Sequence, residues 1–255
     1  DQMRAESLSC YGHPLVKMPN FDKVATEGVM FDQCHVQNPL CSPSRISLMT
    51  GWYSHVGGHR SLCNLLKPDQ PSLFKYLNKA GYHIEWYGKN DLYTKEYFEK
   101  YIDKYEFEGG YGDTYGEWKY SDAPEDNVKK YNFLWEPFAK DPSEHKDMQN
   151  VRKGINFLES REEDDKPFFL YLPITMPHPA YSAPQPFHDM YDPDDIPPLR
   201  PSETVNKPEL YNQVGKYRKL DKQEEGFFKK VNAVYLGMNS FVDWMLGQLL
   251  DALEE

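Results

Sequence analysis

The sequence predicts an α/β fold, with a mainly parallel or mixed central sheet sandwiched between helices. Helix-like and strand-like apolar patterns alternate along the chain, which is typical of parallel strands connected by helices. The 255 residues, 39% of them hydrophobic, are enough for the core of one large domain. The longest apolar runs, such as residues 168–172, are far shorter than the ~20 residues of a membrane helix.

Helix and strand signals alternate through the first half of the chain. Proline and asparagine mark the starts of its helices, and glycine marks their ends. We expect a helix over Phe21–Glu27 capped by Asn20 and ended by Gly28, a short strand at Val29–Phe31, a helix from Pro43 in its first position to Thr50 with Gly51 as its stop, a helix from Pro71 to Ala80 closed by Gly81, and a strand at Tyr82–Tyr87.

The second half continues the same alternation. Its patterns predict a helix over Asn150–Glu159, a buried strand at Pro167–Leu172 and a long final helix around Val234. We expect the fold to be incomplete at both ends. No strand leads into Asp1, and no element follows the amphipathic part of the final helix, Phe241–Glu255. We therefore expect the chain to be part of a longer protein.

Two stretches lack a regular period. Residues 93–140 are rich in aromatic and acidic side chains, and residues 173–218 hold many of the prolines. Loops near the strand ends of α/β folds commonly shape the ligand site. We expect both stretches to be long surface excursions that shape a substrate site within one domain over residues 1–255.

The net charge and the cysteine content argue against several classes of partner and site for this protein. The net charge of −11 makes nucleic acids and anionic membranes poor partners, although a few local cations could still bind a small anion. The 4 cysteines are too few for a disulfide scaffold, and none forms the CxxC pattern of a structural zinc site. Scattered cysteines favour a cytoplasmic location over a periplasmic or secreted one.

The segment over residues 38–51 carries the strongest chemical signal. Cys41 stands just before the predicted helix, where backbone N–H groups and the helix dipole stabilise a thiolate or a bound oxyanion. Arg45 follows about one helical turn later, so its guanidinium can return to the same place. From these two residues alone, a buried cysteine beside a surface arginine remains the simpler interpretation.

The full residue order of this segment resembles a known family signature. Cys-Ser-Pro-Ser-Arg followed by Leu-Met-Thr-Gly resembles the signature of the type I sulfatases, in the alkaline phosphatase superfamily. In that family a maturation enzyme oxidises the cysteine to formylglycine. The resemblance extends over essentially the whole chain. It implies formylglycine at Cys41, a maturation enzyme as partner, and Arg45 as the residue that offsets charge on the nucleophile.

The opening residues resemble the metal-binding segment of the same family. Asp1 and Gln2 match its Asp-Gln version, so the implied metal ligands are Asp1, Gln2 and the modified residue at position 41. Oxygen ligands suit Ca²⁺, with Mg²⁺ or Mn²⁺ as alternatives. The resemblance also implies two more metal ligands and a sulfate-contacting lysine downstream of Glu255.

Two further motifs supply the remaining catalytic candidates. Gly-Lys-Asn-Asp, ending in Lys89, Asn90 and Asp91, resembles the family's Gly-Lys-x-His. The resemblance implies that Lys89 contacts the formylglycine and the sulfate. Asp91 stands where histidine is usual, and we assign it to substrate contact. Pro-His-Pro around His178 resembles the segment whose histidine contacts the sulfate near the leaving oxygen.

One element resembles a neighbouring branch of the superfamily. His59-Arg60-Ser-Leu-Cys-Asn64 is similar to an element of the phosphonate monoester hydrolases. There Asn64 would donate a hydrogen bond to a substrate oxygen, and Arg60 would add positive charge. Both are therefore candidates for substrate binding.

Taken as a whole, the resemblance implies a sulfuric ester hydrolase that acts on a small sulfated sugar or aryl sulfate. Neither a nucleic acid nor a membrane is expected as a partner. Two alternatives stay open. A phosphonate monoester or phosphodiester hydrolase with the same nucleophile is favoured by Asp1-Gln2, Arg60 and Asn64. A non-catalytic binding protein of the same fold is favoured by Asp91 alone.

Overall fold

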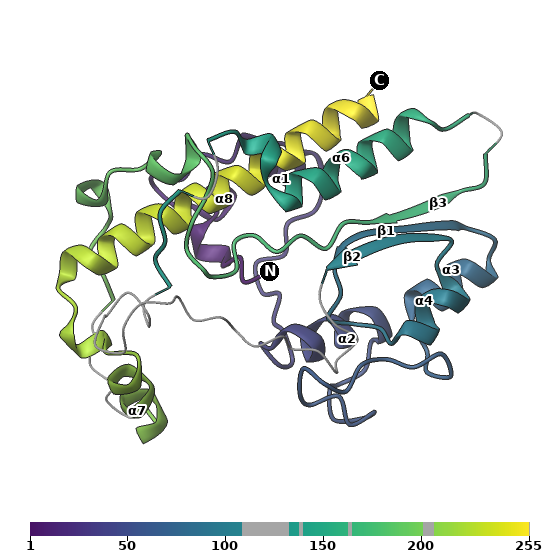
Figure 1. Ribbon diagram of the computed structural model, residues 1–255, viewed down its shortest axis with the longest axis horizontal. Coiled ribbons are helices and arrows are strands. Elements are labelled where there is room, and N and C mark those ends of the chain that lie inside the picture. Colours follow the sequence, from purple (N-terminus) through teal and green to yellow (C-terminus); the bar gives the residue numbers. More distant parts are fainter. Residues whose placement is uncertain (109–132, 138–139, 163–164, 201–206, 255) are drawn as a thin grey trace.

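The centre of the computed structural model is a three-stranded sheet in the order β2-β1-β3 (Figure 1). The structure describes residues 1–108, 133–137, 140–162, 165–200 and 207–254. Strand β1 (His83–Lys89) pairs in parallel with both β2 (Lys104–Glu108) and β3 (Phe168–Tyr171). The parallel sheet expected from the sequence is confirmed. Because the strands are parallel, their carboxyl ends meet at one edge of the sheet.

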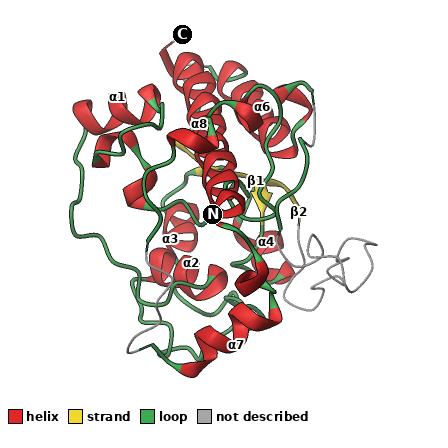
Figure 2. Ribbon diagram, turned by 90° about the vertical axis from the view of Figure 1, so that its left-hand side faces the viewer, coloured by secondary structure: helices red, strands yellow, loops and turns green. Residues whose placement is uncertain are grey.

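Helices cover both faces of this sheet (Figure 1). Helices α3 (Leu73–Lys79) and α4 (Lys95–Tyr101) lie on one face, and α6 (Lys146–Glu159) and α8 (Glu225–Glu254) lie on the other. The long helix α8 runs between α6 and α1 (Figure 2). The remaining described elements are α1 (Pro19–Glu27), α2 (Cys41–Thr50), α7 (Glu209–Tyr217) and 3₁₀ turns at Ala5–Ser7, Ser9–Tyr11, Pro142–Glu144, Phe187–Asp189, Pro193–Asp195 and Leu220–Lys222. None of the helices in the described residues has the length and apolarity needed to cross a bilayer.

Buried side chains form one layer between the sheet and helices α3 and α4, and another between α6 and α8. On the α3 and α4 side, Trp86 of β1 is fully buried, with its ring 5.5 Å from Phe74 and 4.6 Å from Tyr171. On the other side, Met238 and Phe241 of α8 pack against α6 in a second buried cluster. Burial of such aromatic and aliphatic side chains contributes about 1.5–3 kcal/mol each. The two layers hold the sheet and its carboxyl edge in place.

The expected helix ends agree with the structure. Gly28, Gly51 and Gly81 follow α1, α2 and α3. Gly51 and Gly81 take left-handed backbone angles, with φ of 72° and 85°, which a residue with a Cβ adopts at a cost. The expected strands at 82–87 and 167–172 correspond to β1 and β3. The helices expected at 150–159 and around Val234 correspond to α6 and α8, each of which begins earlier.

Several predicted boundaries are wrong. Helix α1 begins at Pro19, so Asn20 is not its cap, and the Asn20 amide instead donates to Asp243 Oδ2 at 2.9 Å. Helix α2 begins at Cys41, so Pro43 is its third residue rather than its first. Pro71 also lies outside its helix, since α3 begins at Leu73. Each predicted helix start lies two residues from the observed one, and sequence signals often misplace boundaries by this much.

The strand expected at 29–31 is absent. Val29 is 79% exposed and Phe31 68% exposed, and within the described residues this segment belongs to no strand. A strand forms only where a neighbour supplies backbone hydrogen bonds, and the described sheet ends at β2 and β3. Local apolar character alone therefore did not determine the conformation of these residues.

The stretch 93–140 begins in the core rather than on the surface. It opens with α4 and β2, and Tyr93, Tyr97 and Phe98 are completely buried. The rings of Tyr93, just before α4, and Tyr97, within it, stack with their centroids 3.7 Å apart. The prediction for residues 109–132 and 138–139 lies outside the described residues.

The stretch 173–218 follows β3 and is anchored to the rest of the molecule. Tyr191 and Ile196 are buried in a cluster with Leu236 of α8. Helix α7, at the end of this stretch, instead exposes Leu210 and Tyr217. Residues 201–206 lie outside the described residues. The anchored beginning of this stretch carries His178, which makes it part of the site described below.

Candidate active site

Cys41 is the first residue of α2 and is half-buried. Its position at the helix start leaves backbone N–H groups without intrahelical partners, and these groups favour a negative atom beside them. The hydroxyl of Ser42 donates to the carbonyl of Leu62 at 3.3 Å, which ties this helix start to the following loop. The sequence reasoning placed Cys41 before the helix, and the structure places it in the first turn.

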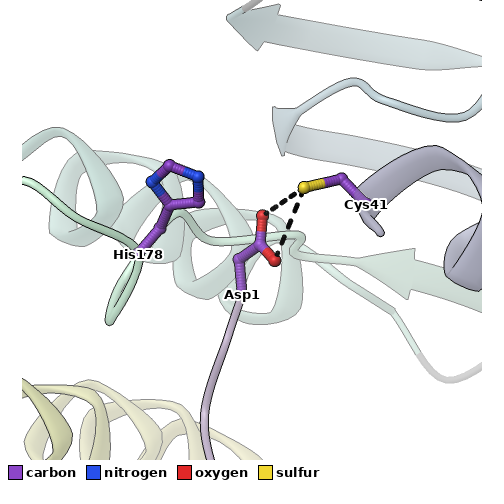
Figure 3. Close-up of side chains that lie close together, drawn as sticks. All are labelled: Asp1, Cys41 and His178. Atoms are coloured by element: carbon purple, nitrogen blue, oxygen red, sulfur yellow. Dashed lines mark hydrogen bonds between the residues drawn. The ribbon is translucent and has the colours of Figure 1, made fainter. Parts of the chain in front are cut away.

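Three segments far apart in the sequence meet at Cys41 (Figure 3). The carboxylate of Asp1 lies 3.6 Å from Cys41 Sγ through its Oδ2 atom. His178 faces the same point from the segment after β3. One ligand atom from each of Asp1, Cys41 and His178 lies within 4.8 Å of the other two. The structure therefore brings together a carboxylate, a sulfur and an imidazole that the sequence motifs had identified separately.

Two cations surround the Asp1 carboxylate. Lys89 Nζ lies 2.6 Å and Arg45 3.5 Å from Asp1 Oδ2. Lys89 Nζ also lies 3.9 Å from Cys41 Sγ. All three charged side chains are largely buried, at 18%, 13% and 10% exposure for Lys89, Arg45 and Asp1. Because water screens buried charges weakly, these cations act strongly on any anion formed or bound at position 41.

Lys89 reaches this point because β1 ends in a close backbone contact. Gly88 has a φ of 132°, and a Cβ there would lie 2.6 Å from the carbonyl oxygen of Pro173. The next amide, Lys89 N–H, donates to that same carbonyl at 2.8 Å. Only glycine fits this approach without strain, so the Gly-Lys pair is a requirement of the backbone as well as of the chemistry.

A buried carboxylate holds the backbone just before His178. Asp147, at the start of α6, accepts hydrogen bonds from the Thr175 amide at 2.9 Å and the Met176 amide at 2.8 Å. Its two oxygens thus fix the chain just before His178. Sequence reasoning missed Asp147. The signal was an acidic residue in the first turn of a helix next to a strand-end loop, a position that often binds backbone N–H groups.

The environment of His178 favours its neutral form. Burial lowers the pKa of His178 below its ordinary value, and the Lys89 ammonium lowers it further, while the Pro179 carbonyl opposes both. His178 Nδ1 donates to that carbonyl, so Nε2 is an acceptor in the neutral ring. At neutral pH the imidazole can therefore take up a proton beside Cys41.

Tyr171 is a second residue that sequence reasoning missed. It is the last residue of β3, and its phenol oxygen hydrogen-bonds to Arg45. Burial raises the pKa of Tyr171, and Arg45 opposes this rise. A tyrosine at the carboxyl end of a parallel strand was the available signal, because such positions face the ligand edge of the sheet.

The other candidates take different positions. Asp91 lies at the site, with Oδ2 3.0 Å from Lys89 Nζ. Asn64 is half-buried, and its amide donates to the carbonyl of Gly58 at 2.8 Å, within its own loop. Arg60 is exposed. Gln2 is exposed, with a φ of 61°, and the structure describes no hydrogen bond between its side chain and the cluster.

A family model described as Sulfatase matches residues 1–255. The chain belongs to the sulfatase family. This sulfatase chain is 31% identical, over 70% of its length, to 29% of an N-acetylglucosamine-6-O-sulfatase from Bacteroides thetaiotaomicron. It is 26% identical, over its whole length, to 58% of an arylsulfatase from Clostridium perfringens.

A solved structure supports the fold assignment. The phosphonate monoester hydrolase of Agrobacterium radiobacter superposes on the whole sulfatase chain with a TM-score of 0.71, at 20% identity and over 57% of its own length. At this identity the likeness concerns the fold alone. The sulfatase chain thus spans between 29% and 58% of the proteins named here.

The donor atoms of the sulfatase chain fit a divalent cation as part of a ligand set. The Asp1 carboxylate is a hard oxygen ligand beside position 41, where formylglycine would add oxygen in place of sulfur. Calcium takes about 6–8 oxygen ligands, so these two residues would fill only part of its coordination shell. The Gln2 side chain, which the sequence also predicted as a ligand, is exposed, and its role stays a prediction.

Proposed function

We propose that the protein containing this chain hydrolyses sulfate esters, with formylglycine at position 41 as its nucleophile. One observation supports this most directly. The start of α2, the end of β1 and the segment after β3 bring Cys41, Lys89 and His178 to one point, around the Asp1 carboxylate. Side chains from separate segments of the chain therefore meet at the position of the proposed nucleophile.

The proposed reaction uses both hydroxyl groups of the hydrated aldehyde. One hydroxyl loses its proton, its oxygen attacks sulfur, and the bond between sulfur and the alcohol oxygen breaks. The second hydroxyl then loses its proton, the C=O bond forms again, and the C–O bond to sulfate breaks. Sulfate leaves, and the aldehyde is restored. A thiol has no second hydroxyl, so unmodified Cys41 has no group for this second step.

The side chains of the site have distinct proposed roles. Lys89 and Arg45 offset negative charge that develops on the nucleophile and the sulfuryl oxygens. His178, neutral with Nε2 as acceptor, takes the proton of the attacking hydroxyl and returns it to the leaving alcohol. A divalent cation held by Asp1 and position 41 would lower the pKa of the attacking hydroxyl. We propose Ca²⁺, with Mg²⁺ or Mn²⁺ as alternatives.

The proposed substrate is a small sulfated sugar or aryl sulfate. The names of the two relatives given above, a 6-O-sulfatase of N-acetylglucosamine and an arylsulfatase, support both classes. We further propose that residues 173–218, which begin beside His178, contribute to recognition of the group that carries the sulfate. An enzyme that matures Cys41 is part of this proposal.

The deciding experiment compares two ester classes. The full-length protein is co-expressed with a formylglycine-generating enzyme, and formylglycine at position 41 is verified by mass spectrometry. Hydrolysis of an aryl sulfate and of an aryl phosphonate monoester is then measured, with Cys41→Ala as the control. We expect faster sulfate turnover that disappears in the variant. Faster phosphonate turnover would assign the protein to the phosphonate hydrolases. If the matured protein hydrolyses neither aryl ester and no sugar sulfate, a non-catalytic binding role would be favoured.

A further inference from the structure

Lys89 is held between two carboxylates rather than one. Its ammonium lies 2.6 Å from Asp1 Oδ2 and 3.0 Å from Asp91 Oδ2. Cys41 Sγ lies 3.9 Å away. The ammonium donates to Asp1 and Cys41, and charge attraction holds it beside Asp91. The position of the ammonium relative to position 41 therefore depends on both carboxylates.

Asp91 depends on Lys89 to an unusual degree. The residue is only 8% exposed, and within the described part of the chain its buried Oδ2 atom accepts no aligned hydrogen bond. The ion pair with Lys89 compensates this buried charge. A buried carboxylate without a cation is strongly unfavourable, so the two side chains constrain each other.

The turn after β1 fixes the backbone on both sides of Asp91. Its neighbour Asn90 is completely buried. The side-chain oxygen of Asn90 accepts from the amides of Leu92 at 3.1 Å and Tyr93 at 3.0 Å, and its amide donates to the Tyr93 carbonyl at 2.9 Å. Such bonds between a side chain and the following backbone fix a turn. The carboxylate of Asp91 is therefore presented to Lys89 from a rigid support.

Asp1 and Asp91 differ in what else they contact. Asp1 also pairs with Arg45 and contacts Cys41, and it is the carboxylate proposed above for the divalent cation. Among the described ion pairs, Asp91 takes part only in the one with Lys89. A carboxylate also repels a sulfate group at short range, which argues against direct contact between Asp91 and the sulfuryl oxygens. These differences separate a shared carboxylate from one dedicated to Lys89.

We propose that Asp91 is a positioning residue, which holds the Lys89 ammonium directed at position 41 while Asp1 serves its other partners. This inference rests on the proposed function, and it replaces the direct substrate contact expected for Asp91 from sequence.

The kinetic test uses Asp91→Asn in the matured, full-length protein. The substitution keeps the shape and removes the charge, and Asp69→Asn makes the same change at an exposed site. We expect kcat to fall about 10- to 100-fold, because small misplacements of a catalytic group have effects of this size, with KM changed less than about threefold. Asp91→Glu should recover part of the loss. A raised KM with unchanged kcat would instead assign Asp91 to substrate contact, and kinetics equal to the control would overturn the proposal.

A second measurement does not need activity. The unfolding equilibria of Asp91→Asn, Lys89→Met and the double variant form a double-mutant cycle. Independent effects would multiply to give the unfolding equilibrium constant of the double variant. We expect the measured constant to be at least about tenfold smaller, because the second change removes a charge that the first left unpaired. Independent effects would overturn the pairing. If the wild-type protein hydrolyses no ester, the proposed function fails, whereas this cycle still decides whether Asp91 holds Lys89.

Discussion

The carbonyl oxygen of Pro173 occupies the space that a Cβ on Gly88 would need, at 2.6 Å from that position. The same oxygen accepts the Lys89 amide at 2.8 Å. The end of β1 and the segment after β3 are thereby locked together at the carboxyl edge of the sheet. This one contact fixes the origin of the Lys89 side chain and the start of the segment that leads to His178.

Replacing Gly88 with alanine should disturb this lock. Gly88→Ala places a Cβ against Pro173 and requires an unfavourable φ of 132°. We expect unfolding free energy to fall by about 1–3 kcal/mol and turnover to fall as Lys89 moves. Gly215→Ala is the matched control, since nothing lies within 4 Å of its added Cβ in α7. Urea unfolding and kcat measurements on both variants check this, and equal behaviour of the two would contradict it.

Removal of the Asp147 carboxylate should release the segment before His178. Asp147→Ala leaves the amide of Thr175 and the buried amide of Met176 without their acceptor. We expect a loss of about 1–3 kcal/mol in unfolding free energy, because an unsatisfied buried amide costs about this much, whereas water can replace the acceptor at the exposed Thr175. We also expect lower kcat as His178 loses its position. Denaturant titration and kinetics test this, with Asp69→Ala as an exposed control. A stability change no larger than that control would count against the assignment.

The hydroxyl of Tyr171 should matter for rate and little for folding. Tyr171→Phe keeps the ring in the aromatic core and removes the contact with Arg45. We expect kcat/KM to fall about tenfold, the equivalent of one lost hydrogen bond of about 1.4 kcal/mol, with a nearly unchanged melting temperature. The comparison is Tyr76→Phe, on an exposed tyrosine of α3. Unaltered kinetics would show that Arg45 needs no support from β3.

Stability at acid pH should depend on Asp189. Hydrogen bonds from His188 first, and then from Gln185, hold the pKa of Asp189 at about 2, below its ordinary value of 3.8. A lowered folded-state pKa stabilises the protein fully above the unfolded-state pKa, and that stability is lost as pH falls through the folded-state value. Asp189→Asn should therefore reduce the loss of stability between about pH 4 and pH 2. Urea midpoints across this range measure it, and identical pH profiles for both proteins would refute it.

Much of the architecture was predictable from local patterns. The glycines after α1, α2 and α3 and the strands β1 and β3 followed from capping rules and alternation. The candidate site residues Cys41, Lys89 and His178 could be singled out because their motifs are ordered and specific. Their meeting at one edge follows from parallel strands, whose carboxyl ends lie side by side.

What the sequence did not show depends on contacts made in three dimensions. Asp147 and Tyr171 act through residues that precede or follow them by many positions, so no short motif includes them. The stretch 93–108 looked irregular because α4 is only seven residues long, too short for a clear period, although Tyr97, Phe98 and Tyr101 share its buried face. The segment 29–31 looked like a strand, but its strand character required a neighbour that the described sheet does not provide.

The contacts of Asp1 with the rest of the site have a consequence for refolding experiments. Its partners Cys41, Lys89 and Met176 lie 40, 88 and 175 positions away. Contacts over such sequence distances form late, after local helices, because the entropy of closing long loops opposes them. Turnover recovered during refolding should therefore lag behind the circular dichroism signal of the helices, and an enzymatic assay would record the last step of assembly.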